Sequence, residues 1–465
     1  MTIRPLTAYL AIFTGIPEIP LAACVSPLIG ISILAICIYT TLIPNRHLRY
    51  LRLLLSLPGF FCFVDFAWST WYERMHNRTS FLALGTISCY GIMRLLETCW
   101  IRELDEDTPR WISKPMKVVE METETKAKLT IWRDVAVNGG RNRNGLTRDR
   151  FVLQLPTRTW KRILYTLDLL TNVRGTSWFA DRTWDFAPSY ARTFVPPTGT
   201  SRIPFIFTQI KSMAVQYLVM DVIDTFIKSQ LPSWNKASSS PVTTLNSILF
   251  QLAASFAVCC TTILYLTIPY AFMSASFVAM GSSPTSWPPI VFDPLSSRSL
   301  VDFWGRGWHH IFRRVFNRIS MAILWPIRSS HKKHIPAARK TCIFLLSATL
   351  HLALLTTLQP RKPAVDNPHP RSHRSLVEMG TIKFFMAQPI GLFIESCVVQ
   401  PLVRSLFGSS TRLQAHALRG FAWCWLLWTG RWWADAWIGG GMYDETEMPV
   451  IWSPFRGLIW GTWIL

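Results

Sequence analysis

Residues 341–360 read TCIFLLSATLHLALLTTLQP and contain no charged side chain. An α-helix of about 20 apolar residues is long enough to cross the ~30 Å hydrocarbon core of a bilayer. His351 is the eleventh residue of this window, so at ~1.5 Å per residue it falls about 15 Å from either end of the helix. The window therefore predicts a membrane-spanning helix with one ionisable group near the bilayer midplane.

The composition of the whole chain agrees with a membrane protein. Of its 465 residues, 50% are hydrophobic, 13% aromatic and only 16% charged, whereas a soluble domain has about 25% charged residues. Collagen-like, coiled-coil, disordered and small disulfide-rich classes are excluded. The 48 Lys+Arg outnumber the 27 Asp+Glu and give a formal net charge of +21. Such an excess indicates a phosphate-bearing ligand or an anionic membrane surface, and the high hydrophobic content makes nucleic acid the least favoured partner.

Other weakly charged windows predict an all-α polytopic fold with about seven to nine transmembrane helices. Arg94 and Glu97, three residues apart, would pair inside a bundle if their window spans the membrane; the alternative is an interfacial helix. Pro269 divides a long uncharged stretch, so we expect a span to end before it and a shorter or re-entrant element to follow. The main windows are 19–45, 53–72, 81–100, 246–267, 381–403 and 416–438.

Three regions follow from this pattern. Residues 1–100 form N-terminal transmembrane helices, 101–207 are mainly an extramembrane region, and 208–465 form a membrane core. The middle region has no window long enough to span and carries the basic tract NGGRNRNGLTRDR at 138–150, which favours the cytosolic side. No internal repeat is evident, which argues against a transporter. We expect an integral multi-pass protein of the endoplasmic reticulum.

His351 is the first candidate for chemistry. An imidazolium in hydrocarbon is strongly disfavoured, so the ring should stay neutral, and a neutral imidazole is a base. An ionisable residue near the bilayer midplane is energetically costly, so its presence there indicates a functional role. The alternatives are a packing histidine bonded to a neighbouring helix, or a loop-facing one if the helix is shifted.

A second candidate is the segment SLVDFWGRGWHHIFRR at 299–314, which is dense in charge and aromatic rings. Arg306, Arg313 and Arg314 could bind phosphates because guanidinium matches phosphate oxygens bidentately, and the Trp rings offer stacking faces. The alternative is an amphipathic helix whose arginines lie on lipid headgroups.

Two motifs in these segments carry a family resemblance. DFWGRGWH at 302–309 and FLLSATLH at 344–351 resemble the two signatures of the wax synthase-like branch of the membrane-bound O-acyltransferase superfamily. RGTSW at 174–178 is similar to an Arg-Gly-x-x-Trp element of its fungal members, which acetylate secondary metabolites. The resemblance extends over about residues 160–440.

The resemblance implies a helical enzyme with an internal acyl-transfer tunnel, in which 208–465 is the catalytic core. By position, His351 is the catalytic base, and His309 orients it or bonds the thioester carbonyl. The adjacent His310 is the alternative second residue, because neighbouring histidines on a helix point about 100° apart and at most one faces the site. The resemblance also implies substrate-binding roles for the rest of the first motif. Asp302 and Arg306 would hold its shape, and Trp304 and Trp308 would line the coenzyme A or acyl channel.

The expected function is transfer of an acyl group, with acetyl-CoA favoured as donor, to a hydroxyl of a hydrophobic terpenoid or meroterpenoid. A base that removes the hydroxyl proton suffices, and neither a metal nor a bound cofactor is expected. Expected partners are acyl-CoA, a hydrophobic alcohol and the lipid bilayer. The alternatives are a long-chain acyl-CoA:alcohol acyltransferase that makes wax or sterol esters, a transporter in which His351 couples protons, and an inactive scaffold.

Overall fold

The computed structural model describes fourteen stretches of the chain, and the structural statements below concern these residues. They are 25–68, 78–105, 107–114, 152–192, 194–238, 245–291, 293–308, 310–327, 335–358, 370–408, 410–439, 443, 450 and 452–463. Nearly all regular structure in them is helical, and five helices are long and apolar enough to cross a membrane. The predicted all-α membrane fold is confirmed. The candidate spans are His47–Phe66, Arg202–Gln230, Ile248–Ala279, Ile335–Leu355 and Met379–Phe407.

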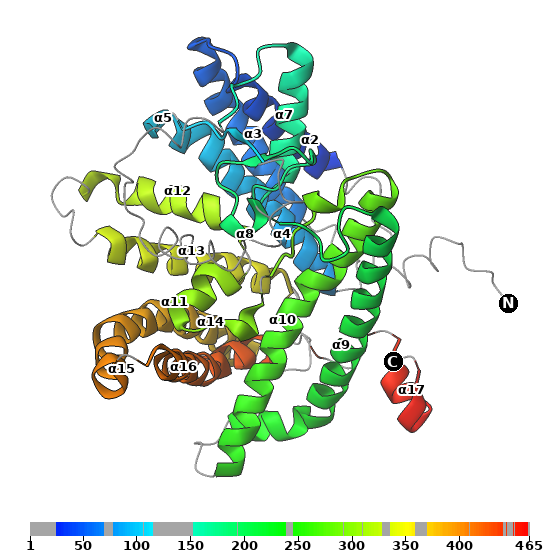
Figure 1. The fold of residues 1–465 in the computed structure, drawn as a ribbon, viewed down its shortest axis with the longest axis vertical. Coiled ribbons are helices and arrows are strands. Elements are labelled where there is room, and N and C mark those ends of the chain that lie inside the picture. Colours follow the sequence, from blue (N-terminus) through cyan, green and yellow to red (C-terminus); the bar gives the residue numbers. More distant parts are fainter. Residues whose placement is uncertain are drawn as a thin grey trace.

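The N-terminal helices form one bundle with the middle region (Figure 1). Its core contains Leu34, Phe63, Tyr165 and Trp184, all of which are buried. Its elements are α2 (Val25–Thr40), α3 (His47–Trp68), α4 (Arg78–Leu95), the π-helix η3 (Leu96–Ile101), α5 (Arg102–Asp105), β1 (Trp111–Ser113), α7 (Thr159–Thr171), β2 (Arg182–Trp184) and α8 (Ser189–Arg192). The two strands pair antiparallel.

Two long helices, α9 (Arg202–Ser238) and α10 (Leu245–Ala279), lie side by side (Figure 1). The predicted break at Pro269 is wrong, because α10 continues through it for ten residues. A proline removes one helical hydrogen bond, and packing against neighbouring helices allows membrane helices to tolerate that loss.

The span in α9 was not predicted, because its sequence contains several charges. The structure shows that the acidic ones have ion-pair or hydrogen-bond partners inside the protein. Asp224 is fully buried and forms ion pairs with Lys228 at 3.1 Å and Arg456 at 2.9 Å. Asp221, also fully buried, accepts hydrogen bonds from Ser453 and from the main-chain N–H of Phe455. Arg456, Ser453 and Phe455 come from the region of α17 (Pro454–Trp460) near the C-terminus, whereas Lys228 lies on α9 itself.

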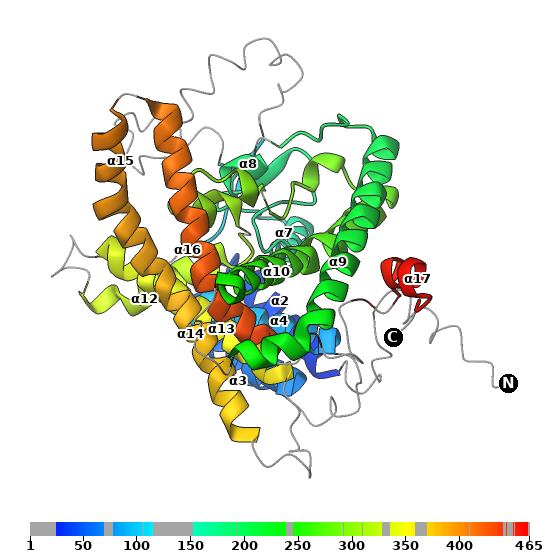
Figure 2. The same cartoon turned by 90° about the horizontal axis from the view of Figure 1, so that it is seen from below.

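The C-terminal half forms the second and larger core, built from α10, α13, α14 and α16. Figure 2 shows α14 and α16 running side by side; α13 packs against α14, and α12 packs against α13. The elements are η5 (Pro284–Ser286), η6 (Pro294–Ser296), α11 (Leu300–Asp302), the π-helix η7 (Phe303–Gly307), α12 (Arg313–Ile323), η8 (Trp325–Ile327), α13 (Ile335–Leu358), α14 (Pro370–Ile394), η9 (Glu395–Val399), α15 (Gln400–Phe407) and α16 (Thr411–Gly439).

Candidate active site

His351 lies on α13 in a defined orientation. Its Nδ1 is 2.7 Å from the main-chain oxygen of Ser347 on the preceding turn. A carbonyl oxygen can only accept, so Nδ1 carries the proton and donates it to this bond. In the neutral ring, Nε2 is then the nitrogen with the free lone pair. The local geometry therefore supplies a base at Nε2.

Two aromatic side chains from other helices form the walls around this ring. Phe385 of α14 stacks on the imidazole with centroids 4.6 Å apart, and Trp433 of α16 meets it edge-on at 5.0 Å. Phe384 contacts both of these rings, at 5.1 and 5.4 Å. We call these three residues the aromatic cluster. His351 is thus held where α13, α14 and α16 meet, among apolar surfaces that favour its neutral form.

The first motif reaches the aromatic cluster through Trp304. Its ring lies 6.4 Å from Phe384 and 5.3 Å from Phe344 of α13. Its Nε1 donates to Oε1 of Gln388 at 3.2 Å, and Nε2 of Gln388 donates to Oγ1 of Thr429 on α16 at 3.1 Å. The structure therefore joins the two sequence motifs through one continuous set of side chains.

The other motif residues hold a compact turn. Arg306 forms two hydrogen bonds to the carboxylate of Asp302, at 2.8 and 2.7 Å. Trp308 is partly buried and packs 5.7 Å from Trp304. Glu395 of η9 accepts from the main-chain N–H groups that begin this turn. The turn is thereby tied to η9 at its first residues and to α14 through the indole of Trp304.

His309 and the adjacent His310 stand at the end of the first motif. His309 lies outside the described residues. His310 is 5% exposed and faces Tyr190, with ring centroids 5.8 Å apart, and the guanidinium of Arg313 at 3.5 Å. Burial, and then the charge of Arg313, lower the pKa of His310 to about 4. His310 is therefore neutral at pH 7 and packs toward α8, whereas His351 packs toward α14 and α16.

A family match covers both motifs. Residues 287–367 match the model described as "Membrane bound O-acyl transferase family". This match supports assigning the chain to that family. Together with the relatives below, it supports a membrane O-acyltransferase, and such an enzyme requires an acyl donor and a hydrophobic acceptor.

Curated fungal relatives agree with this assignment. The O-acyltransferase is 24% identical over 314 residues to acetyltransferase eriL of Hericium erinaceus, covering 66% of this chain and 74% of the relative. It is 25% identical over 324 residues to acetyltransferase atnC of an Arthrinium species, covering 63% and 69%. It is 23% identical over 328 residues to acetyltransferase ple2 of Rhodocybe pseudopiperita, covering 70% and 76%. No solved structure matches the chain significantly.

The RGTSW element of the O-acyltransferase has a structural task. Arg174 donates to the main-chain oxygens of Pro288 and Pro289 at 2.9 and 2.7 Å, and to Tyr270 at 2.8 Å. It thereby fixes the segment that leads into the first motif. At the other end of the element, Asp168 of α7 accepts from the side chain of Ser177 and the main-chain N–H of Trp178, at 2.8 and 2.9 Å.

The arginines that follow the motif lie in different surroundings. Arg314 donates to Glu97 at 2.6 Å and to Asp107 at 3.0 Å. Its guanidinium is engaged in a buried ion-pair network and is not presented to a phosphate. The predicted pair of Arg94 and Glu97 is confirmed and belongs to the same network. Arg313, in contrast, is exposed beside His310.

Sequence reasoning missed two polar residues of the site, Gln388 and Thr429. Both are buried, at 0% and 2% exposure, and both lie in predicted membrane windows. A buried amide needs hydrogen-bond partners. Gln388 stands alone among apolar residues at 384–394, and this pattern could have identified it as a buried polar residue. The sequence could not have identified its partner Trp304, which lies 84 residues away.

Proposed function

We propose that this O-acyltransferase moves an acetyl group from acetyl-CoA to a hydroxyl of a hydrophobic terpenoid or meroterpenoid, with His351 as general base. The observation that carries the proposal is the bond from Nδ1 of His351 to Ser347, which leaves Nε2 free to accept a proton. The relatives named acetyltransferases support the choice of acetyl as the transferred group. A neutral histidine has an ordinary pKa of about 6.5, which suits base catalysis near pH 7.

The proposed reaction has two steps. Nε2 of His351 takes the hydroxyl proton while the acceptor oxygen attacks the thioester carbonyl and forms a tetrahedral oxyanion. The carbon–sulfur bond then breaks, and the departing thiolate of coenzyme A takes the proton from Nε2. The ester and free coenzyme A are the products, and His351 returns to its neutral form. No acyl-enzyme is needed.

The other roles are proposed from the resemblance and the geometry together. His309 would orient the base or bond the thioester carbonyl. Trp304 and Trp308 would line the path of the acyl donor, supported by their partly buried rings next to the aromatic cluster. Asp302 and Arg306 would keep the turn in shape, supported by their two-bond pairing. The tunnel itself stays a prediction, as does the endoplasmic reticulum as the enzyme's membrane.

The test uses microsomes from cells that express the wild type, His351→Ala or Thr349→Ala. Thr349 lies two residues away, is exposed on the same helix and bonds only to its own helix, so its variant is a matched control. Labelled acetyl-CoA or palmitoyl-CoA is supplied with hydroxylated terpenoids and fatty alcohols, and labelled esters are counted. Density fractionation of the same cells, with markers for each membrane, tests the location.

We expect acetyl esters with the wild type and with Thr349→Ala, and a loss of about 10²–10⁴-fold with His351→Ala at equal expression. Formation of palmitoyl esters in place of acetyl esters would show that the donor is a long-chain acyl-CoA and not acetyl-CoA. Undiminished ester formation by His351→Ala would disprove the assigned base. Intact thioester with every acceptor would favour a transporter or scaffold.

A further inference from the structure

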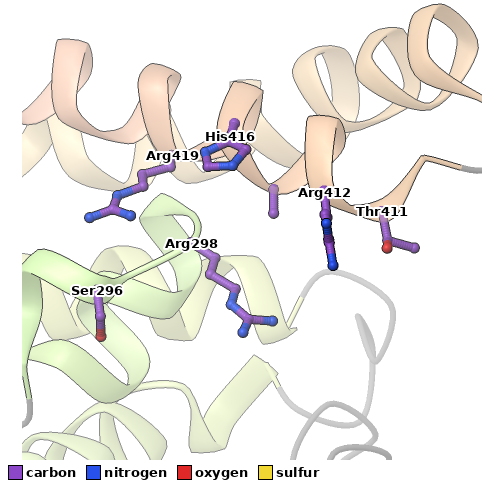
Figure 3. Close-up of a pocket in the computed structure, with 7 residues that line it drawn as sticks. Ser296, Arg298, Thr411, Arg412, His416 and Arg419 are labelled. Atoms are coloured by element: carbon purple, nitrogen blue, oxygen red, sulfur yellow. The ribbon is translucent and has the colours of Figure 1, made fainter.

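A basic groove of about 580 Å³ lies between the segment that precedes the first motif and the N-terminal turns of α16 (Figure 3). Three arginines and a histidine line it together with two hydroxyl side chains. The residues are Ser296, Arg298, Thr411, Arg412, Ala415, His416 and Arg419. None of them was singled out from the sequence, because they come from two segments more than 110 residues apart.

The arginines of this basic groove have few acceptors nearby: Arg419 donates to the main-chain oxygen of Leu295, and Arg298 interacts electrostatically with Asp302. Within the part of the chain that the structure describes, no ion pair involves Arg298, Arg412 or Arg419. The nearby carboxylate of Asp302 is occupied by Arg306, although it also accepts from the main-chain N–H of Arg298. Exposed guanidinium groups without acidic partners attract an anion, and their planar shape matches phosphate oxygens.

The helix geometry strengthens the attraction. Thr411 is the first residue of α16, so the positive end of that helix dipole faces the same space. Ser296 and Thr411 add hydroxyl groups that can donate to phosphate oxygens. The groove therefore offers both charge and directed hydrogen bonds to a ligand with several phosphates.

The separation between the basic groove and His351 matches the length of coenzyme A. Trp433 follows Arg419 on α16 by 14 residues, which corresponds to about 21 Å along the helix. Trp433 contacts His351. The extended phosphopantetheine arm of coenzyme A joins its nucleotide phosphates to its thioester over a separation of this order.

We propose that the basic groove binds the phosphates at the nucleotide end of acyl-CoA through Arg298, Arg412 and Arg419, while the pantetheine arm runs along α16 toward His351. This assignment rests on the proposed function. A phosphate could also come from a lipid headgroup, so the experiment separates these two sources.

The first arm measures binding without catalysis. Purified protein in phosphatidylcholine nanodiscs is titrated with adenosine 3′,5′-bisphosphate, the nucleotide end of coenzyme A. We expect the double variant Arg412→Ala/Arg419→Ala to bind at least about tenfold more weakly, since losing a charge-assisted hydrogen bond changes affinity by that order. Arg404→Ala, an exposed arginine of α15 that does not line the groove, should bind as the wild type does. Equal binding by the double variant and the wild type would overturn the proposal.

The second arm separates acyl-CoA from lipid. The ratio of kcat/KM for acetyl-CoA to that for acetyl-pantetheine, which lacks the nucleotide, should fall about tenfold in the double variant. Anionic lipid in the nanodiscs tests the other source. No nucleotide binding by the wild type, with lipid binding that the double variant loses, would assign the groove to headgroups and overturn the proposal. If the wild type forms no ester, the proposed function fails. The titration still shows whether the groove binds the nucleotide.

Discussion

The imidazole of His351 stacks on the phenyl ring of Phe385, with ring centroids 4.6 Å apart and planes inclined by 28°. The stack fixes the plane of the imidazole, and the bond to Ser347 fixes its tautomer. One constraint comes from α14 and the other from the histidine's own helix. The direction of Nε2 therefore depends on the packing of two helices.

Removing the stack should weaken catalysis without removing the base. We expect Phe385→Ala to lower kcat by about tenfold or more, because a misaligned base loses part of its orientation advantage. KM for the acyl donor should change less. Steady-state kinetics on microsomes checks this, with Phe393→Ala as the control because Phe393 lies on the same helix and is 63% exposed. Equal losses in both variants would contradict the prediction.

The amide of Gln388 should support both stability and activity. Gln388→Leu keeps the size of the side chain but leaves Nε1 of Trp304 without this acceptor and removes the donor to Thr429. An unsatisfied buried polar group costs about 1–3 kcal/mol. We expect a lower midpoint of thermal unfolding in detergent together with lower kcat/KM. Thr429→Val should cost less, since Trp304 keeps its partner; a larger loss for Thr429→Val would argue against this arrangement.

Glu97 should be essential for the N-terminal bundle. Its carboxylate, 2% exposed, faces Arg94, Arg314 and Arg318. Glu97→Gln leaves the buried guanidinium of Arg94 without its counter-charge, whereas Arg314 and Arg318 keep Asp107; breaking a buried pair costs about 3–5 kcal/mol. We expect loss of folded protein, scored by fluorescence-detected size-exclusion chromatography. Asp107→Asn serves as the comparison, because its carboxylate is 47% exposed and an exposed pair contributes about 0–1 kcal/mol.

The protein should lose stability in acid through His310. Burial, then Arg313 and, more weakly, Arg174 hold its pKa at about 4 in the folded chain, against about 6.5 in the unfolded chain. As the pH falls from 6.5 to 4, the unfolded chain takes up a proton that the folded chain does not, so stability decreases. The full effect is on the order of 3 kcal/mol.

Thermal unfolding between pH 8 and pH 5 tests this origin of the acid sensitivity. His310→Asn should flatten the pH dependence, whereas His47→Asn, an exposed position, should keep the wild-type slope. An unchanged slope in His310→Asn would show that another group causes the acid sensitivity.

The sequence alone determined the class of the fold and the residues of the two motifs. A run of uncharged residues is a property of contiguous chain, so the window at 341–360 predicts its helix, and α13 covers most of it. The pair of Arg94 and Glu97 was predictable for the same reason, because positions three apart on a helix are neighbours.

Only the tertiary structure decided what neutralises the charges in α9, what surrounds His351 and where the basic groove forms. Arg456 reaches Asp224 across 232 residues, and the aromatic cluster comes from two helices other than that of His351. Local pattern cannot encode such partners, because a buried polar group can be satisfied by any segment that packing brings within hydrogen-bond distance. The search for uncharged windows therefore missed α9, whose buried Asp224 is paired both with Lys228 on the same helix and with Arg456 far along the sequence.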